Sequence, residues 1–202
     1  TTEQIGELLD SIRSRCDNPH TELVTLLCLA TGARWSEAEK LPAHRLQGNV
    51  VTYAGTKSGK VRHVPIPPEL ANRASAHWRM HGPFTSCITS FRRALDRTTI
   101  QLPQGQASHA LRHSFASHFM MNGGNILTLQ KILGHSTLTM TMRYAHLYPD
   151  HLQDAIKFGP LRCLGSRQIN LSEGLNQNDT PHILFDGMDP AQGAVMAYDF
   201  WI

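Results

Sequence analysis

Apolar residues recur at helical spacing through most of the first 160 residues of this 202-residue chain, and this restricts the fold to a largely helical one. In residues 3–16 the apolar positions follow the i, i+3, i+4, i+7 pattern of an amphipathic helix, at Ile5, Leu8, Leu9 and Ile12. Thr1 and Gln4 have the spacing of a capping box, so we expect the helix to begin there.

Glycines and prolines divide the rest of this helical pattern into separate segments. The run TELVTLLCLATG predicts a buried helix that ends at Gly32. Ser36 and Glu39 form an S-x-x-E signature, which predicts a short helix that begins after Arg34 and stops before Pro42. Further helices are expected over residues 68–80, 86–98, 107–121, 126–133 and 137–147.

One stretch departs from the helical pattern. The runs NVVTYAG and VRHVPI are rich in valine and are joined by TKSGK, which predicts a β-hairpin. The expected fold is therefore mainly α with a small antiparallel β-sheet, an α+β arrangement. We expect residues 1–160 to form one domain. Residues 161–202, which have no clear period, should form a C-terminal extension.

Charge separates these two parts of the chain. Residues 1–160 carry 17 Lys and Arg against 11 Asp and Glu, whereas residues 161–202 carry 2 against 5. The basic first part suits a polyanionic partner. The four cysteines are scattered without a C-x-x-C pair, which favours free thiols in a reducing compartment. No apolar run approaches the roughly 20 residues that span a bilayer, so we expect no membrane segment.

Arg34 is expected at a junction between two helices, close to a hydrophobic segment. A buried guanidinium is costly unless an anion accompanies it. Backbone N–H groups at a helix start favour the same kind of ligand. A second arginine, Arg112, lies three residues after His109 and shares its helix face. The two arginines therefore indicate an anion site.

Four motifs occur in a fixed order. They are T-G-x-R-x-x-E at residues 31–37, a lysine in the hairpin turn, H-x-x-R at residues 109–112, and L-G-H at residues 133–135 with Tyr144 following. This ordered set resembles the tyrosine recombinases, and the surrounding sequence is most similar to integrases of temperate bacteriophages. The resemblance covers roughly residues 3–158.

The resemblance implies a tyrosine recombinase catalytic domain with the DNA breaking-rejoining enzyme fold, in which Tyr144 attacks a DNA phosphate and forms a 3′-phosphotyrosyl intermediate. Arg34 and Arg112 would bind the non-bridging oxygens, and His135 would donate a hydrogen bond to the phosphate. His109 would act as a base or positioning group, and Lys57 as the general acid. No metal and no other cofactor is expected, because the arginines replace the cation and the tyrosyl linkage conserves the bond energy. Candidate DNA-backbone contacts are Lys60, Arg62, Arg92 and Arg93.

Several alternatives remain open. Tyr53 and Tyr148 compete with Tyr144 as the nucleophile, although Tyr53 lies in a predicted strand. Lys60 competes with Lys57, since both lie in the same turn. His109 and His113 imitate the spacing of a zinc helix, but Ala110 replaces the general-base glutamate of that motif, so a zinc hydrolase is disfavoured.

The implied function is site-specific DNA recombination by a phage-type integrase, with double-stranded DNA attachment sites as substrate. The enzyme would assemble as a homo-tetramer on synapsed DNA and be a monomer when free, with an accessory DNA-bending protein as a further partner. It would act in the cytoplasm of a bacterial host, at the nucleoid. The alternatives are a topoisomerase IB-like nicking-closing enzyme, a resolvase or transposon-type recombinase, and an inactive DNA-binding module. Because the chain lacks an initial methionine, we expect a part of a longer protein.

Overall fold

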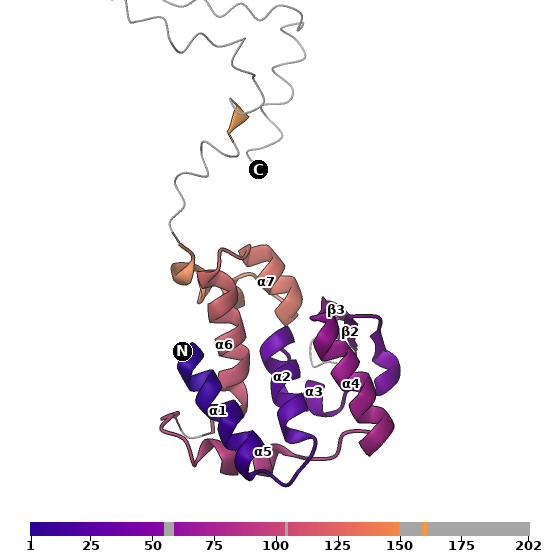
Figure 1. The fold of residues 1–202 in the computed structure, drawn as a ribbon. Coiled ribbons are helices and arrows are strands. Elements are labelled where there is room, and N and C mark those ends of the chain that lie inside the picture. The colour runs from indigo at the N-terminus through magenta and orange to yellow at the C-terminus, as the bar shows by residue number, and fades with distance from the viewer. Residues whose placement is uncertain (55–58, 104, 150–158, 161–202) are drawn as a thin grey trace, which may run out of the picture. The chain divides into compact units, whose positions relative to one another are not determined.

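The computed structural model describes residues 1–54, 59–103, 105–149 and 159–160. The chain divides into two units, Thr1–Asp150 and His151–Ile202, and only the first is described below. The predicted boundary at residue 160 stays a prediction, because 161–202 lie outside the described residues. In chain order the elements are α1 (Thr2–Arg15), α2 (Thr21–Thr31), α3 (Trp35–Glu39), η1 (Ala43–Arg45), β1 (Leu46–Gln47), β2 (Val50–Tyr53), β3 (Arg62–Pro65), α4 (Pro68–His81), α5 (Ile88–Leu95), α6 (Ala107–Met121), α7 (Ile126–Leu133), α8 (Thr139–Met142) and η2 (Ala145–Leu147) (Figure 1).

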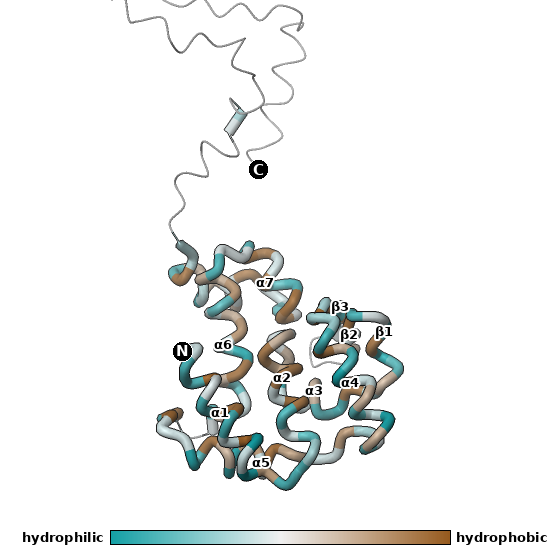
Figure 2. The backbone as a smooth tube through the Cα atoms, in the orientation of Figure 1, coloured by the Kyte–Doolittle hydropathy of each residue, from teal (hydrophilic) through white to brown (hydrophobic). Residues whose placement is uncertain are grey.

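Helix α2 lies at the centre of this unit. Its sequence is apolar on nearly every side, as expected of a helix that is surrounded by others. It packs against α1, α3, α5 and α6, and Val24, Leu27 and Cys28 have no exposed surface. Figure 2 shows hydrophobic residues along much of α2, whereas hydrophilic and hydrophobic residues alternate along α1 and α4. Because α2 is held from all sides, the position of Gly32 at its C-terminus is fixed, and so is the start of the segment that follows.

The predicted hairpin is confirmed, within a sheet of three antiparallel strands in the order β1-β2-β3. Val51 lies opposite Val64 in the register, and both are buried with Tyr53, while the side chains between them are more exposed. This alternation is the period-2 pattern of a sheet with one covered face. The two-residue strand β1 was not predicted.

Several predicted helix boundaries are confirmed. Helix α1 begins with the Thr1–Gln4 capping box, and α2 ends at Gly32, whose φ of 63° lies in the left-handed region. Helices α6 and α7 have the predicted bounds. In α7 the side chain of Asn125 accepts hydrogen bonds from the backbone N–H groups of Leu127 and Thr128.

Three local predictions are wrong. Ser36 does not cap α3; the N-cap is Arg34, and its backbone N–H donates to the carboxylate of Glu37. Glu39 instead accepts hydrogen bonds from the Trp35 indole and the Cys87 backbone. The helix over 86–98 is shorter, as α5 shows, and the segment 137–147 is two short helices rather than one. Its threonines are poor helix formers, and the Thr141 hydroxyl is engaged with His135.

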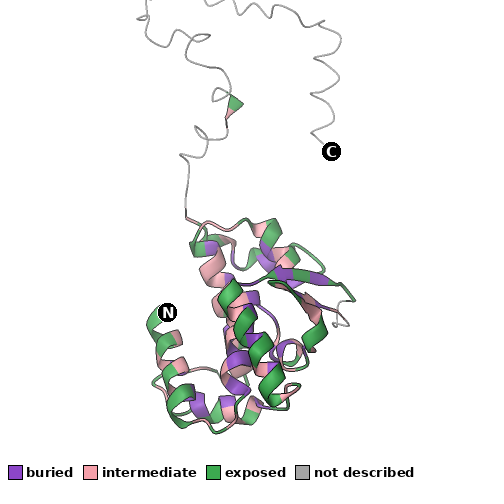
Figure 3. Ribbon diagram, turned by 45° about the vertical axis from the view of Figure 1, so that its right-hand side comes forward, coloured by how far each residue is buried: buried purple, intermediate pink, exposed green. Residues whose placement is uncertain are grey.

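The buried apolar side chains form two clusters. The larger one contains residues of helices α1 through α5 and of the sheet. The smaller one contains residues of α6 and α7 and includes Tyr144. Figure 3 shows buried residues on the inward sides of the helices and exposed residues on their outward sides. Within the described part of the chain, no helix is both long and apolar enough to cross a membrane. Gly32 and Leu133 lie where the two clusters meet, since a Cβ built on Gly32 would lie 2.7 Å from a Leu133 methyl.

We expect Gly32→Ala to lower the free energy of unfolding by about 2–4 kcal/mol, because strain in the left-handed region adds to a clash. A Cβ at Gly32 would lie 2.5 Å from the Phe115 ring. Gly48→Ala is the matched control, since Gly48 also has a positive φ of 58° but nothing lies within 4 Å of an added Cβ. The free energy of unfolding of Gly48→Ala should fall by only about 1–2 kcal/mol. Urea unfolding measures the free energy of unfolding of both variants. Equal decreases would show that the side chains around Gly32 move to accommodate a methyl group at no cost.

Candidate active site

Arg34 occupies the turn between α2 and α3. The left-handed Gly32 ends α2, and Arg34 then takes an extended conformation (φ −69°, ψ 149°) as the N-cap of α3. Its Nη1 lies 3.0 Å from Glu37 Oε1, and about a third of the side chain (31 %) is exposed. The guanidinium is therefore held from one side while its other side remains accessible.

Arg112 is buried on α6 and is held by two backbone carbonyls. Its Nη1 donates to the Gly32 oxygen at 2.8 Å and its Nη2 to the Leu133 oxygen at 2.7 Å. Burial, reinforced by the charges of Arg34 and Arg62, lowers the pKa of Arg112 to about 10. The side chain is still a cation at neutral pH. Because other arginines surround it, an anion bound nearby would stabilise its charge.

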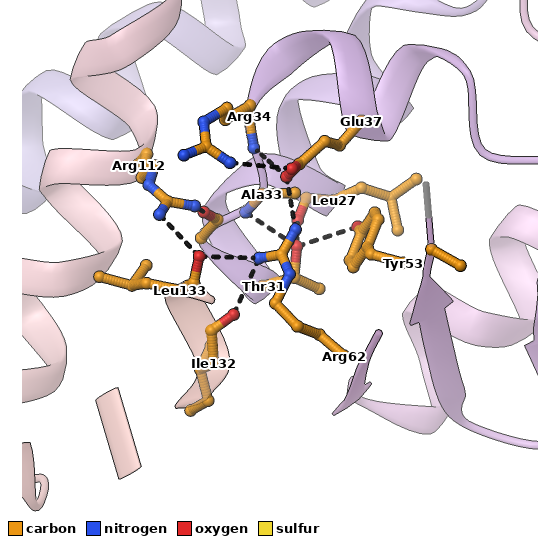
Figure 4. Close-up of polar contacts among 12 residues, drawn as sticks. Leu27, Thr31, Ala33, Arg34, Glu37, Tyr53, Arg62, Arg112, Ile132 and Leu133 are labelled. Atoms are coloured by element: carbon orange, nitrogen blue, oxygen red, sulfur yellow. Dashed lines mark hydrogen bonds and ion pairs between the residues drawn. The ribbon is translucent and has the colours of Figure 1, made fainter. Parts of the chain in front are cut away.

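Arg62 connects the sheet to both of these arginines (Figure 4). Its Nη2 lies 2.6 Å from Glu37 Oε2, and its Nη1 donates to the carbonyl oxygens of Ile132 and Leu133 at 2.9 and 3.2 Å. Glu37 is thus shared by Arg34 and Arg62, and the Leu133 carbonyl is shared by Arg62 and Arg112. Arg62 is only 4 % exposed, so the expectation that it contacts DNA directly does not fit its position.

Glu37 remains ionised within this network. Burial alone would raise the pKa of its carboxyl group, but the backbone N–H of Arg34 and the guanidinium of Arg62 outweigh burial and hold the pKa below 4.5. A negative charge at this point partly offsets the repulsion among three guanidinium groups. Glu37 is therefore the counter-ion that allows the arginines to be close together.

His135 follows the left-handed Gly134 that ends α7. The geometry at Gly134 is close, because an added Cβ would meet the Arg62 side chain at 2.6 Å. The ring of His135 is buried and its Nδ1 is 2.9 Å from the Thr141 hydroxyl. Burial, with the charge of Arg112 next in size, lowers the pKa of His135 to about 4, so the ring is neutral at physiological pH.

Tyr144 lies between α8 and η2 with its ring in the smaller core cluster. The ring is 6 % exposed, and the hydroxyl lies 2.6 Å from Nδ1 of His113 on α6. Burial raises the pKa of Tyr144, although the charges of Arg143 and Arg112 act in the opposite direction. The tyrosine therefore needs a proton acceptor to react at neutral pH, and His113 is in hydrogen-bond contact with it.

A cavity of about 350 Å³ brings most of the predicted catalytic residues together. Its lining comprises Arg34, His109, Arg112, His113, His135, Thr139, Met140, Arg143 and Tyr144. Among these described residues there are three guanidinium groups and no carboxylate. A cavity with this lining suits an anion, and its arginine donors suit the paired oxygens of a phosphate.

The other predicted residues that the structure describes do not line this cavity. Lys57 falls outside the described residues, and Lys60 is exposed in the same turn. Arg92 and Arg93 are exposed on α5, so a role in binding the DNA backbone stays a prediction for them and for Lys60. Tyr53 is buried, donates to or accepts from the Thr31 hydroxyl, and does not line the cavity. Tyr148 is exposed and does not line the cavity either.

Two ionisable side chains of the cavity, His113 and Arg143, are not among the predicted site residues. The sequence pattern relates His113 only to a disfavoured zinc motif. The i, i+4 spacing of His109 and His113 was the available signal, because it places both rings on one face of α6. Among the described residues, no group of three or more His, Cys, Asp or Glu side chains is arranged to hold a metal ion.

Comparison with known proteins identifies relatives of this arrangement. The model of the phage integrase family matches residues 85–151. The integrase of Escherichia phage 186 is 53 % identical over 161 residues, which are 80 % of this chain and 47 % of that protein. The chain spans about half the length of the curated phage integrases that it matches.

Solved structures agree with the sequence comparison. The catalytic domain of bacteriophage HP1 integrase superposes with a TM-score of 0.73 at 48 % identity, over 80 % of this chain and 95 % of that domain. The XerH site-specific recombinase bound to its palindromic difH substrate superposes with a TM-score of 0.61 at 20 % identity, over 78 % of this chain and 52 % of that protein. The second similarity shows a shared fold.

We expect Glu37→Gln to lower the free energy of unfolding by about 3 kcal/mol, because it leaves the buried Arg62 without a counter-ion. The depressed pKa of Glu37 means that its contribution is present above pH 4.5 and is lost as the pH falls through the folded-state value. The difference between the two proteins, measured by urea unfolding, should therefore narrow below pH 4.5.

Glu22→Gln is the matched control for this measurement. Glu22 also pairs with two arginines, Arg13 and Arg73, but both of those side chains are about half exposed. Glu22→Gln should lower the free energy of unfolding by less than about 1 kcal/mol. A loss at Glu37 no larger than at Glu22 would show that the network around Arg62 contributes nothing beyond a surface ion pair.

Proposed function

Because the chain belongs to the phage integrase family of tyrosine recombinases, we propose that it is the catalytic domain of a site-specific DNA recombinase, which cleaves and rejoins DNA through a 3′-phosphotyrosyl intermediate. The observation that carries this proposal is the cavity that brings the Tyr144 hydroxyl to the same space as Arg34, Arg112 and His135. A nucleophile and several cationic or neutral donors around one anion-sized space are what phosphoryl transfer requires.

The arginines supply the electrostatic part of the reaction. A DNA phosphodiester gains negative charge on its non-bridging oxygens while the nucleophile adds. Arg34 and Arg112 present planar sets of N–H donors to those oxygens, and both are already fixed by Glu37 or by backbone carbonyls. His135, kept neutral by its surroundings and held by Thr141, provides a further donor without adding charge.

Tyr144 supplies the covalent part. Its oxygen attacks phosphorus, the bond to the 5′-oxygen breaks, and the DNA 3′ end remains on the enzyme as a phosphotyrosine. This linkage retains the free energy of the phosphodiester, so a 5′-hydroxyl can later reverse the step without ATP. The guanidinium groups take the place that a metal ion holds in other phosphoryl-transfer sites.

The departing 5′-oxygen needs a proton, and Lys57 in the β2–β3 turn is the proposed donor. Lys60, in the same turn, is the alternative. In the complete reaction the substrate is double-stranded DNA, and four copies would act on two synapsed attachment sites with the help of a DNA-bending protein. The proposed place of action is the cytoplasm of a bacterial host.

Tyr144→Phe should abolish covalent attachment to DNA, since the substitution removes only the attacking oxygen. The measurement uses a library of nicked duplexes of random sequence at low salt in EDTA, with SDS-resistant adducts captured and sequenced. Tyr148→Phe is the matched control and should retain the adduct. An adduct that persists in Tyr144→Phe would identify another nucleophile, and an adduct that requires Mg²⁺ would contradict the metal-free mechanism.

Lys57→Ala should slow cleavage of the captured DNA sequence by a hundredfold or more, in the range of general acid catalysis at about 10²–10⁴-fold. A substrate with sulfur in place of the 5′-bridging oxygen should restore the rate, because a thiolate leaves without a proton. Lys60→Ala, measured in parallel, should be close to the unmodified protein. If the sulfur substrate rescues Lys60→Ala instead, Lys60 is the acid.

A further inference from the structure

We propose that His113 accepts the proton of Tyr144 in the cleavage step and returns it in the rejoining step. This inference rests on the proposed function. It differs from the assignment that the family resemblance implies, in which the histidine at the first position of the H-x-x-R motif, His109, has the base or positioning role. The observation that carries it is the 2.6 Å separation of the Tyr144 hydroxyl and Nδ1 of His113.

The geometry distinguishes the two histidines. His113 lies one turn after His109 on α6, and both line the cavity. In the described part of the chain, the hydrogen bond of Tyr144 goes to His113, and the two rings are tilted with their centroids 5.8 Å apart. A general base must lie within hydrogen-bond distance of the proton that it removes. His113 meets this condition without any rearrangement.

The electrostatic surroundings favour acceptance of a proton rather than permanent charge. Burial, followed by the charges of Arg143, His109 and Arg112, lowers the pKa of His113, so the ring is neutral at pH 7. Neutral imidazole with its own proton on Nε2 offers Nδ1 as the acceptor. Arg143 and Arg112 also favour the ionised form of Tyr144, so the same charges help the proton to leave the tyrosine.

Cleavage exchanges one phosphorus–oxygen bond for another. A lone pair of the Tyr144 oxygen forms the new bond to phosphorus while the hydroxyl proton moves to Nδ1 of His113. The bond from phosphorus to the 5′-oxygen breaks, and its electron pair stays on that oxygen, which takes a proton from Lys57 in the proposed mechanism. In rejoining, a 5′-hydroxyl attacks phosphorus and gives its proton back to Lys57. The bond from phosphorus to the Tyr144 oxygen breaks, and His113 returns its proton to that oxygen.

The experiment measures single-turnover adduct formation between pH 6 and 9.5, with the 202-residue chain and its captured DNA. His113→Asn is the decisive variant, because its side-chain amide can hold the hydroxyl in place but cannot take its proton. His113→Ala removes both contributions. His118→Ala, on the same helix but outside this cavity, is the matched control, and His109→Ala tests the alternative base.

We expect both His113 variants to be about a hundredfold or more slower at pH 7, the range of general base catalysis. Their rates should rise about tenfold per pH unit up to pH 9, since hydroxide then removes the Tyr144 proton, and burial raises the pKa of this hydroxyl above its ordinary value. The unmodified protein and His118→Ala should show no such rise above pH 7. His109→Ala should be slower without this rise.

Three results would overturn the inference while leaving the proposed function intact. These are an unchanged rate in His113→Asn, a loss in His113→Ala that does not depend on pH, or the pH-dependent rise in His109→Ala instead. If the unmodified protein forms no Tyr144-dependent adduct, the proposed function and this inference fail together.

A second measurement needs no DNA. The ¹⁵N chemical shifts of the His113 ring should report a protonated Nε2 and a hydrogen-bonded Nδ1, and the Nδ1 shift should change in Tyr144→Phe. A protonated Nδ1 in the free protein would overturn the inference.

Discussion

Three arginines share two acceptors in the candidate active site, and the remainder of the site depends on that sharing. The Glu37 carboxylate joins Arg34 to Arg62, and the Leu133 carbonyl joins Arg62 to Arg112. Guanidinium groups this close repel one another, and this repulsion adds to burial in lowering the pKa of Arg112. Each acceptor therefore offsets repulsion and also fixes the orientation of a guanidinium group, so that Arg34 and Arg112 both line one cavity.

The same contacts join parts of the chain that are distant in sequence. Arg62 begins β3, Glu37 lies in α3, and Leu133 ends α7, immediately before the glycine that precedes His135. A shift of the sheet would therefore also displace the turn that carries His135. The two left-handed glycines, Gly32 and Gly134, allow this close approach, because a methyl group at either would meet a neighbouring side chain.

Much of this could be predicted from sequence, because the relevant signals are local. Helical period predicted α6 and α7 to the residue, and the ordered motifs identified Arg34, Arg112, His135 and Tyr144, which the structure places around one cavity. The errors have tertiary causes. From sequence alone, Arg62 cannot be distinguished from a surface cation. In the fold it is buried and paired with Glu37. His113 acquires its partner only because the chain returns to α6 after α7, which no local pattern reveals.

The surplus of positive charge around Glu37 has a thermodynamic consequence for the protein as a whole. The folded domain holds several cations close together with one carboxylate to compensate them, whereas the unfolded chain keeps the same groups far apart in water. An oxyanion in the cavity relieves this repulsion only in the folded state. Ligand binding and folding would then be linked equilibria, so a phosphate-bearing ligand that occupied the cavity would raise the melting temperature of the domain.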